Sequence, residues 1–320
     1  MFANPFVRKT KRIVCFGGGN AMPISVLRGL KEKDAEITAV CSVLDSGGSS
    51  GKLRKEYGII SPGDLRRAFL ELSDFPVEDK KLFNYRFREG ELAGHVLGNL
   101  VFLALCLNKE NYHEVFEKLN KLLDDRYKIL PSTIHPSELV AVLENGQEIV
   151  GETKIDIPVH DAGLKIKKVF LRPLVSACPQ TIRRIGEADM IVIGPGDVYS
   201  SLMQIFLVDG ISRAIKNSRA KKVYVCNLMT KNGESNGFRV EDFASEVEKY
   251  IQCPLDYVLY QNKKPKEERV RKYKEKHKEL VEPVECIAPL PNFLGRDIMT
   301  EEGDILHDPK KLADVIFSLM

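Results

Sequence analysis

The segment Ile37-Thr38-Ala39-Val40-Cys41-Ser42-Val43-Leu44-Asp45-Ser46-Gly47-Gly48-Ser49-Ser50-Gly51 indicates the fold class. Its first half, up to Val43, is apolar and rich in β-branched residues, which is typical of a buried strand. Its second half places an acid at the end of that strand, followed by glycines and serines. Glycines let backbone N–H groups approach an anion closely, and serine hydroxyls add donors without bulk. The segment therefore predicts a strand that runs into a ligand-binding loop, although such a loop taken alone could equally be a flexible surface turn.

Comparable glycine-rich turns follow two other apolar runs. Gly17-Gly18-Gly19-Asn20 comes after the run 12–16, and Gly194-Pro195-Gly196-Asp197 comes after the run 190–193. Because the carboxyl ends of parallel strands meet at one edge of a sheet, three such junctions predict a single ligand crevice there. We expect Gly17, Asp45 and Gly194 to converge on that crevice.

The segments between these junctions alternate helical and strand patterns, which predicts an α/β fold with a mostly parallel sheet. Residues 136–173 are the exception. Two β-rich runs there flank Asn145-Gly146, a type I′ hairpin signal, and a third run, 165–172, is stopped by Pro173. We expect a small antiparallel insertion between the two halves of the sheet.

Length and composition exclude several classes of protein. A chain of 320 residues can bury a large core, and its 48 Lys and Arg nearly balance 45 Asp and Glu, which gives no support for nucleic-acid binding. The densely charged run 263–278 is interpreted as a solvated helix. Seven cysteines without a CxxC pair favour reduced thiols over disulfides or zinc. No stretch has transmembrane length and the N-terminus lacks a signal-peptide pattern, so we expect a cytoplasmic protein without membrane insertion.

A nicotinamide-dependent oxidoreductase is one alternative. Gly17 and Gly19 fit the first two positions of the G-x-G-x-x-G fingerprint, but Met22 occupies the third. Asp45 could imitate the ribose-binding acid, yet it opens a second glycine loop instead of standing alone. The motif is defective, and NAD(P) chemistry is the least favoured of the functions considered.

Polar residues at predicted helix starts are further candidates. Asp64 precedes a helix predicted over 65–73, where an N-cap role is the ordinary interpretation. Arg66 and Arg67 follow in the first turn, which is unfavourable for cations and indicates that an arginine faces an anion. Neighbours on a helix are about 100° apart, so we expect Arg66 to face the anion and Arg67 to point elsewhere. His95, beside glycines at the start of an apolar helix, is either a ligand contact or a structural histidine.

Taken together, the loops resemble a known family, the gluconeogenesis factor (YvcK-type) proteins within the superfamily of 2-phospho-L-lactate transferase (CofD). The similarity spans about residues 12–315 and implies a single Rossmann-like domain over residues 1–320, with three α/β/α layers and the insertion at about 136–173. The matching segments, in the same order as in the family, are Gly17-Gly18-Gly19, Asp45-Ser46-Gly47-Gly48-Ser49-Ser50-Gly51, Pro62-Gly63-Asp64-Leu65-Arg66, Tyr85-Arg86-Phe87, Gly94-His95 with Gly98-Asn99, Gly194-Pro195-Gly196 and Tyr224-Val225-Cys226-Asn227-Leu228-Met229-Thr230.

The resemblance also implies a site for a phosphorylated nucleotide. For YvcK-type members the ligand is a UDP-sugar, and their role concerns carbon metabolism, cell shape and cell-wall precursor supply. For the transferase branch it is a lactyl-phospho-guanosine donor, used with Mg²⁺. Asp45 and Asp64 are the candidate Mg²⁺ ligands. The residues expected at the nucleotide site are Gly17, Gly18, Gly19, Asn20, Asp45, Gly47, Gly48, Ser49, Ser50, Asp64, Arg66, His95, Asn99, Gly194, Gly196 and Asn227.

The chain departs from the family pattern at several of these positions. Ser46 stands where a second acid is usual, which weakens a two-carboxylate Mg²⁺ site. Asn20-Ala21 replaces the usual continuation of the first glycine loop, and Asp197 replaces a serine after Gly-Pro-Gly. The family's Arg-His-Asp near the C-terminus is Leu306-His307-Asp308 here.

Two functions from different classes follow. The leading one is a nucleotide-sugar-binding regulatory protein, in which glycine loops and helix N-termini hold the diphosphate and Asp45, Arg66 and Asn227 make polar contacts. The rival is a transferase that moves a phosphorus-containing group from a nucleotide donor. The sequence identifies no activated nucleophile, so both stay open. Mg²⁺ is the one cofactor considered, and we expect no other. The expected partner is the nucleotide or nucleotide-sugar ligand, and the formation of a homodimer is left open.

Overall fold

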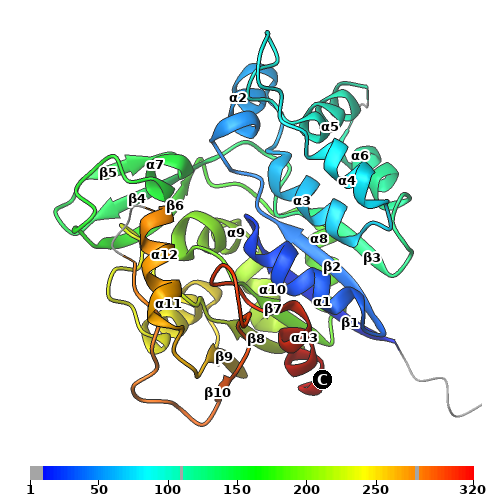
Figure 1. Cartoon of the computed structure of the whole chain (residues 1–320). Coiled ribbons are helices and arrows are strands. Elements are labelled where there is room, and N and C mark those ends of the chain that lie inside the picture. Colours follow the sequence, from blue (N-terminus) through cyan, green and yellow to red (C-terminus); the bar gives the residue numbers. More distant parts are fainter. Residues whose placement is uncertain (1–9, 109–110, 278–280) are drawn as a thin grey trace, which may run out of the picture.

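The computed structural model of the chain describes residues 10–108, 111–277 and 281–320. Its centre is a seven-stranded sheet with the strand order β10-β9-β8-β7-β1-β2-β3 (Figure 1). Every strand pair in this sheet is parallel. The strands are β1 (Lys11–Gly17), β2 (Ala35–Cys41), β3 (Tyr127–Pro131), β7 (Met190–Ile193), β8 (Lys221–Val225), β9 (Tyr257–Gln261) and β10 (Phe293–Arg296).

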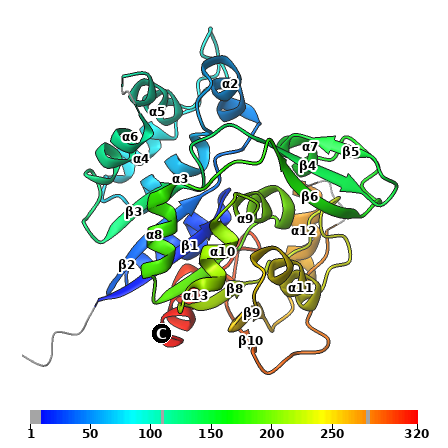
Figure 2. The ribbon, with the colours of Figure 1, turned by 180° about the vertical axis from the view of Figure 1, so that it is seen from behind.

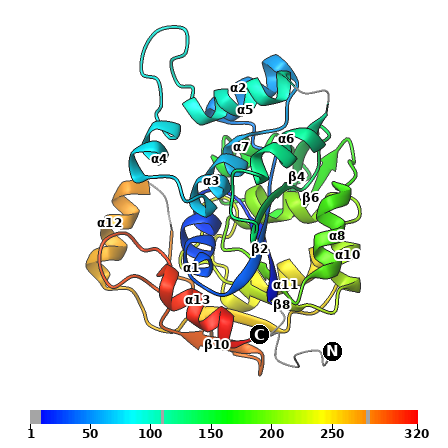
Figure 3. The ribbon, with the colours of Figure 1, turned by 90° about the vertical axis from the view of Figure 1, so that its right-hand side faces the viewer.

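The central strands are apolar because helices cover both of their faces. β7 is buried along its whole length, and the last five residues of β1 are buried. In Figure 3, α1 (Arg28–Lys31) and α13 (Pro309–Ser318) lie on one side of the sheet. On the other side lie α8 (Pro179–Glu187), α10 (Ile211–Asn217) and α11 (Val240–Ile251). The three α/β/α layers of the expected Rossmann-like fold are confirmed.

The remaining helices extend these layers. A π-helical turn (Met22–Leu27) leads into α1, and a second one (Val198–Met203) leads into α9 (Gln204–Phe206). Helix α3 (Gly63–Leu72) and four further helices lie in the upper part of Figure 1, above β2 and β3. The four are α2 (Gly48–Tyr57), α4 (Val77–Phe83), α5 (Leu97–Leu107) and α6 (Tyr112–Asn120). Helix α12 (Glu267–His277) lies at the left of the same view. None of the helices that the structure describes has the length and apolar character needed to cross a bilayer.

The predicted antiparallel insertion is confirmed as a small separate sheet. Its strands are β4 (Glu138–Leu143), β5 (Glu148–Val150) and β6 (Ile166–Arg172), in the order β5-β4-β6, with both pairs antiparallel. A short helix, α7 (Glu152–Asp156), follows β5. Figure 2 shows this sheet projecting to one side of the main sheet.

Candidate functional site

The main sheet has its topological switch point between β1 and β7. From β1 the chain continues to β2 and β3 on one side, whereas from β7 it continues to β8, β9 and β10 on the other. Gly17–Asn20 leaves β1 and Gly194–Asp197 leaves β7 at the same carboxyl edge, and the N–H of Gly194 donates to the carbonyl of Phe16 over 2.9 Å. Ligands of open α/β sheets bind at such a point, because the outgoing loops separate there.

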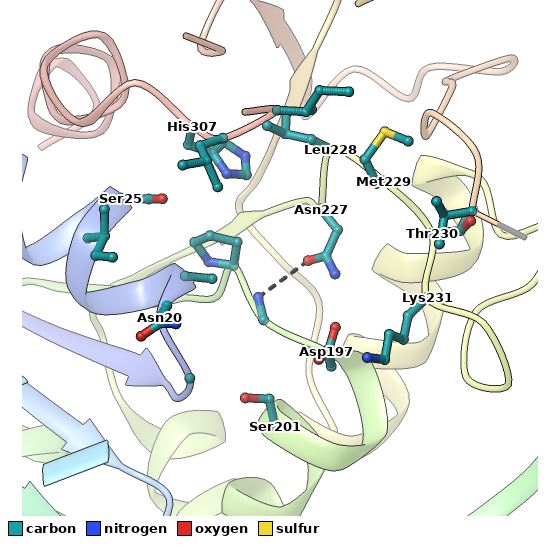
Figure 4. Close-up of a pocket in the computed structure, with 18 of the residues that line it drawn as sticks. Asn20, Ser25, Asp197, Ser201, Asn227, Leu228, Met229, Thr230, Lys231 and His307 are labelled. Atoms are coloured by element: carbon teal, nitrogen blue, oxygen red, sulfur yellow. Dashed lines mark hydrogen bonds between the residues drawn. The ribbon is translucent and has the colours of Figure 1, made fainter. Parts of the chain in front are cut away.

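A cavity of about 310 Å³ lies between these two loops, and we call it the crevice cavity (Figure 4). Asn20 and Ser25 lie on one side of it, and the segment Asn227–Lys231 lies on the other. Its lining comprises Gly18, Gly19, Asn20, Ala21, Ile24, Ser25, Pro195, Gly196, Asp197, Ser201, Asn227, Leu228, Met229, Thr230, Lys231, Tyr273, Val281, Ile305, Leu306 and His307. One end is therefore made of glycine loops and the other largely of apolar side chains.

The apolar end has a structural origin. Leu228, Met229, Val281, Met299 and Ile305 form a small hydrophobic cluster separate from the main core, with Tyr273 packed against it. All of these except Met299 also line the crevice cavity. An apolar wall next to a polar loop is the usual division of a small-molecule site.

Asn227 links the two sides of the crevice. It follows β8, and its Oδ1 accepts a hydrogen bond from the N–H of Gly196 over 3.3 Å (Figure 4). This contact fixes the amide side chain against the loop after β7. The sequence prediction placed Asn227 at the site, and the structure places it in the lining.

The crevice cavity carries little net positive charge. Its cationic residue is Lys231, whose Nζ pairs with Asp156 at 3.3 Å, and Asp197 supplies a negative charge. Burial lowers the pKa of His307 to about 4, so this side chain is neutral near pH 7, with its Nε2 3.1 Å from the carbonyl oxygen of Cys226. A phosphate bound here would therefore meet no uncompensated cation of the lining.

The Asp45 loop forms a second group of predicted residues, next to the crevice. Oδ1 of Asp45 accepts a hydrogen bond from the N–H of Gly47 over 2.8 Å, and α2 begins at Gly48. Glu152 of the insertion accepts from the N–H of Ser46 over 3.2 Å. Burial and the charge of Asp45 raise the pKa of Glu152 to about 8. The insertion therefore holds this loop in place.

Serine and asparagine side chains tie together the starts of two helices. The Ser49 Oγ accepts from the N–H of Val96 at 3.2 Å and from Nδ2 of Asn99 at 3.1 Å, and it lies 3.4 Å from Nδ1 of His95. Asn99 Nδ2 also lies 3.5 Å from Oγ of Ser50. These groups use one another as hydrogen-bond partners, so their direct role in this structure is to join α2 to α5.

Asp64 connects the Asp45 loop to the crevice. Its buried carboxylate accepts a hydrogen bond from the N–H of Gly19 at 3.0 Å and pairs with Nη2 of Arg67 at 2.5 Å. Burial raises its pKa, while Arg67 opposes that shift. Gly18 must lack a side chain, because a Cβ there would lie 2.3 Å from Oδ2 of Asp64, and Gly19 has the left-handed φ of +61° that favours glycine. Asp64 thus shapes the first glycine loop.

A second cavity, of about 440 Å³, lies on the other side of this loop, and we call it the basic cavity. Asn20 and Ile24 line both cavities. The lining of the basic cavity comprises Asn20, Pro23, Ile24, Arg28, Arg66, Arg67, Leu70, Glu71, Lys80, Asn84, Arg86 and Val96. Arg66 and Arg67 both line this cavity, although the sequence predicts that only Arg66 faces the anion. Their guanidinium groups have different partners, because Arg66 donates to Asn99 and Asn84 whereas Arg67 pairs with Asp64 at i−3.

Three carboxylates near the crevice lie close enough together to be considered for a metal. Within the described residues, the ligand atoms of Asp156, Asp197 and Glu234 lie within 4.8 Å of one another. Glu234 accepts hydrogen bonds from the N–H groups of Tyr199 (2.8 Å) and Ser200 (3.1 Å), and burial together with Asp197 raises its pKa to about 8. Glu234 therefore caps the π-helical turn after β7, and we assign no metal to this group.

The structure divides the predicted site residues between these places. Gly18, Gly19, Asn20, Gly196 and Asn227 line the crevice cavity, Gly17 and Gly194 lie in the same loops, and Arg66 lines the basic cavity. The others surround the Asp45 loop. Sequence reasoning missed Tyr273, because the charge pattern of its helix indicates only a solvated surface. It also missed Lys231, which directly follows the matching segment that ends at Thr230.

Comparisons with known proteins confirm the resemblance. Residues 13–288 match the family model described as 2-phospho-L-lactate transferase CofD. A protein from Thermotoga maritima, provisionally named gluconeogenesis factor, is 41% identical over 312 residues, which cover 95% of this chain and 98% of the relative. The gluconeogenesis factor of Bacillus subtilis is 36% identical over 315 residues, which cover 97% and 98%. The crystal structure of a UPF0052 family protein from Bacillus halodurans has a TM-score of 0.89 at 34% identity, covering 97% of this chain and 99% of that one. The chain belongs to the CofD family and, within it, to the group of the gluconeogenesis factors.

Proposed function

We propose that the chain is a regulatory protein that binds a nucleotide-sugar of the UDP-sugar class, with the nucleoside in the crevice cavity. The observation that carries this proposal is the division of that cavity into a glycine-loop end and an apolar end at the switch point of the sheet. Backbone N–H groups of such loops suit a diphosphate. The wall of Leu228, Ile305 and Tyr273 suits the faces of a base and a ribose.

The regulatory role is the finer part of the proposal. Membership of the gluconeogenesis factor group supports a link to carbon metabolism. We extend this link to cell shape and cell-wall precursor supply, since a sensor of a nucleotide-sugar would report on the pool of activated sugars. Such a sensor binds its ligand and releases it unchanged.

Mg²⁺ belongs to the proposal as a companion of the diphosphate, in the ordinary arrangement of one or two carboxylates plus phosphate oxygens. Oδ1 of Asp64 already accepts hydrogen bonds from Gly19 and Arg67. Asp45 uses its Oδ1 to accept from Gly47. Its Oδ2 lies on the side of Gly63, 3.4 Å from the position that a Cβ on that glycine would take. We therefore expect Asp45, more than Asp64, to contact the ion. In that case Asp45→Asn, which keeps the acceptor for Gly47, should abolish any dependence of nucleotide affinity on Mg²⁺.

The alternative is a transferase of the CofD type that uses a nucleotide-activated phosphorylated donor. The family match supports it, and so does Glu152, because a half-buried carboxyl with a pKa of about 8 beside Asp45 has the character of an acid–base group. The two functions differ in the fate of the donor. A sensor returns the nucleotide-sugar intact, whereas a transferase consumes it.

Isothermal titration with UDP-glucose, followed by chromatography of the recovered ligand, tests the proposal. We expect saturable binding and intact UDP-glucose after long incubation with Mg²⁺. Leu306→Glu, which places a charge on the apolar wall near a diphosphate ligand, should weaken binding about tenfold or more. Leu290→Glu is the matched control, because Leu306 is 46% exposed and Leu290 is 57% exposed, and Leu290 does not line the crevice cavity.

Equal affinity in the two variants would contradict the placement of the nucleoside. Hydrolysed or transferred donor in the recovered ligand would favour the transferase.

A further inference from the structure

The basic cavity gathers more positive charge than its own acids compensate. Arg28, Arg66, Arg67, Lys80 and Arg86 line it, with Glu71 as the acid of the lining. Glu71 pairs with Arg28 at 2.7 Å and Asp64 pairs with Arg67 at 2.5 Å. Within the described part of the chain, no carboxylate oxygen lies within 4 Å of the charged nitrogens of Arg66, Arg86 or Lys80.

The three remaining cations are held by neutral oxygens. Arg66 donates from Nε to Oδ1 of Asn99 over 3.0 Å, and also to Oδ1 of Asn84. Arg86 donates to the carbonyl of Gly94 over 2.7 Å, and Lys80 donates to the carbonyl of Ser73 over 2.9 Å. These contacts fix the cations in place without neutralising them.

Burial in this arrangement of cations lowers the pKa of Arg66. Burial, together with the charges of Arg67 and Arg86, lowers the pKa of its guanidinium to about 10. A cluster of like charges is unfavourable unless an opposite charge joins it. A planar guanidinium matches the oxygen geometry of a phosphate more closely than a lysine ammonium does, so Arg66 and Arg86 are well suited to bind such an anion.

We propose that the basic cavity binds a phosphate-class dianion, held chiefly by Arg66 and Arg86, with Lys80 adding positive charge. Asn20 and Ile24 separate it from the crevice cavity, whose own lining offers no uncompensated cation. The dianion is either the phosphate end of the nucleotide, reaching past Asn20, or a separate small phosphorylated compound. Only the first source rests on the proposed function, and the anion site itself can be tested without a nucleotide.

Titration with pyrophosphate at low salt tests the site in the intact protein. We expect saturable binding to the wild type, a loss of about tenfold or more in Arg66→Gln and a smaller loss in Arg86→Gln. The matched control is Arg88→Gln, because Arg88 is an exposed arginine of the same loop as Arg86 that does not line the cavity. Its affinity should equal that of the wild type, and thermal melts should show that all the variants are folded.

Competition with UDP-glucose separates the two sources of phosphate. If the nucleotide supplies it, pyrophosphate and UDP-glucose compete, and Arg86→Gln weakens both. If a separate compound supplies it, both ligands bind together, and Arg86→Gln weakens only pyrophosphate. Absence of pyrophosphate binding to the wild type, or equal binding by Arg66→Gln and Arg88→Gln, would overturn the anion site. Failure of UDP-glucose alone to bind would overturn the proposed function and leave the anion site standing.

Discussion

His307 is a buried histidine that the fold holds in its neutral form. Its pKa is about 4 in the folded chain against an ordinary value of 6.5, because burial disfavours the imidazolium. Between these two values the unfolded chain binds more protons than the folded one. Stability against unfolding therefore falls as the pH drops from 6.5 toward 4, because protons bind preferentially to the unfolded chain. Over this range His307 accounts for a loss of roughly 3 kcal/mol in the free energy of unfolding.

His307→Gln should remove this component of the pH dependence. We expect the variant to be less stable than the wild type near neutral pH, since it disturbs a buried contact with Cys226. The difference should shrink by about 2 kcal/mol near pH 5, where only the wild type has begun to lose the histidine contribution. Urea unfolding of both proteins at the two pH values measures this. An unchanged difference would mean that His307 is not held neutral.

The arginine pair of α3 shows how far single residues can be predicted. The awkward position of Arg66 in a helix start indicates an anion nearby, and the structure places it in the basic cavity. Arg67 lines the same cavity but is paired with Asp64, because a helical angle fixes where a side chain begins and not where a long, flexible one ends. The partner that redirects Arg67 is Asp64, which the sequence allows to be read as a simple N-cap.

Among the helices, α1 packs closely against α13 because Gly29 has no side chain. A Cβ on Gly29 would lie 2.0 Å from the carbonyl oxygen of Pro309. Gly29→Ala should therefore destabilise the protein by about 1–3 kcal/mol, because α13 would have to move away from α1. Gly186, in α8, is the matched control, since a Cβ there meets no atom within 4 Å. Gly186→Ala should be neutral or stabilising by up to about 1 kcal/mol.

Chemical denaturation of the two alanine variants measures both effects with the same substitution. Equal stability of the two would contradict the close packing of α1 against α13.

Among helices, strands and turns, the sequence predicts most clearly the features that depend on residues adjacent in the chain. The three strand-to-loop junctions and the Asn145-Gly146 hairpin depend on adjacent residues, and all of them are present. The sequence does not indicate strands β3 and β10, because they form the two edges of the sheet and their pairing depends on strands formed elsewhere. The contact of Asp64 with Gly19 spans 45 residues, so no local pattern could indicate it.

For the whole molecule, the two cavities on either side of the Gly17–Asn20 loop predict a marked stabilisation by ligand. A nucleotide that binds only the folded chain adds about 2.7 kcal/mol at a hundred times its Kd. Thermal melts with UDP-glucose, UDP and uridine should therefore rank in that order, since uridine lacks the phosphates that the glycine loops would hold. A melting temperature that responds equally to uridine and UDP would show that the loops do not bind phosphate.

Hydrogen–deuterium exchange with and without UDP-glucose tests the central claim, that the nucleotide binds at the β1/β7 switch point. The account predicts slower exchange in the loops that line the crevice cavity, 17–25, 194–201 and 227–231, and unchanged exchange in α6 on the far side of β3. Protection confined to other segments, or no protection at a saturating concentration of ligand, would contradict it.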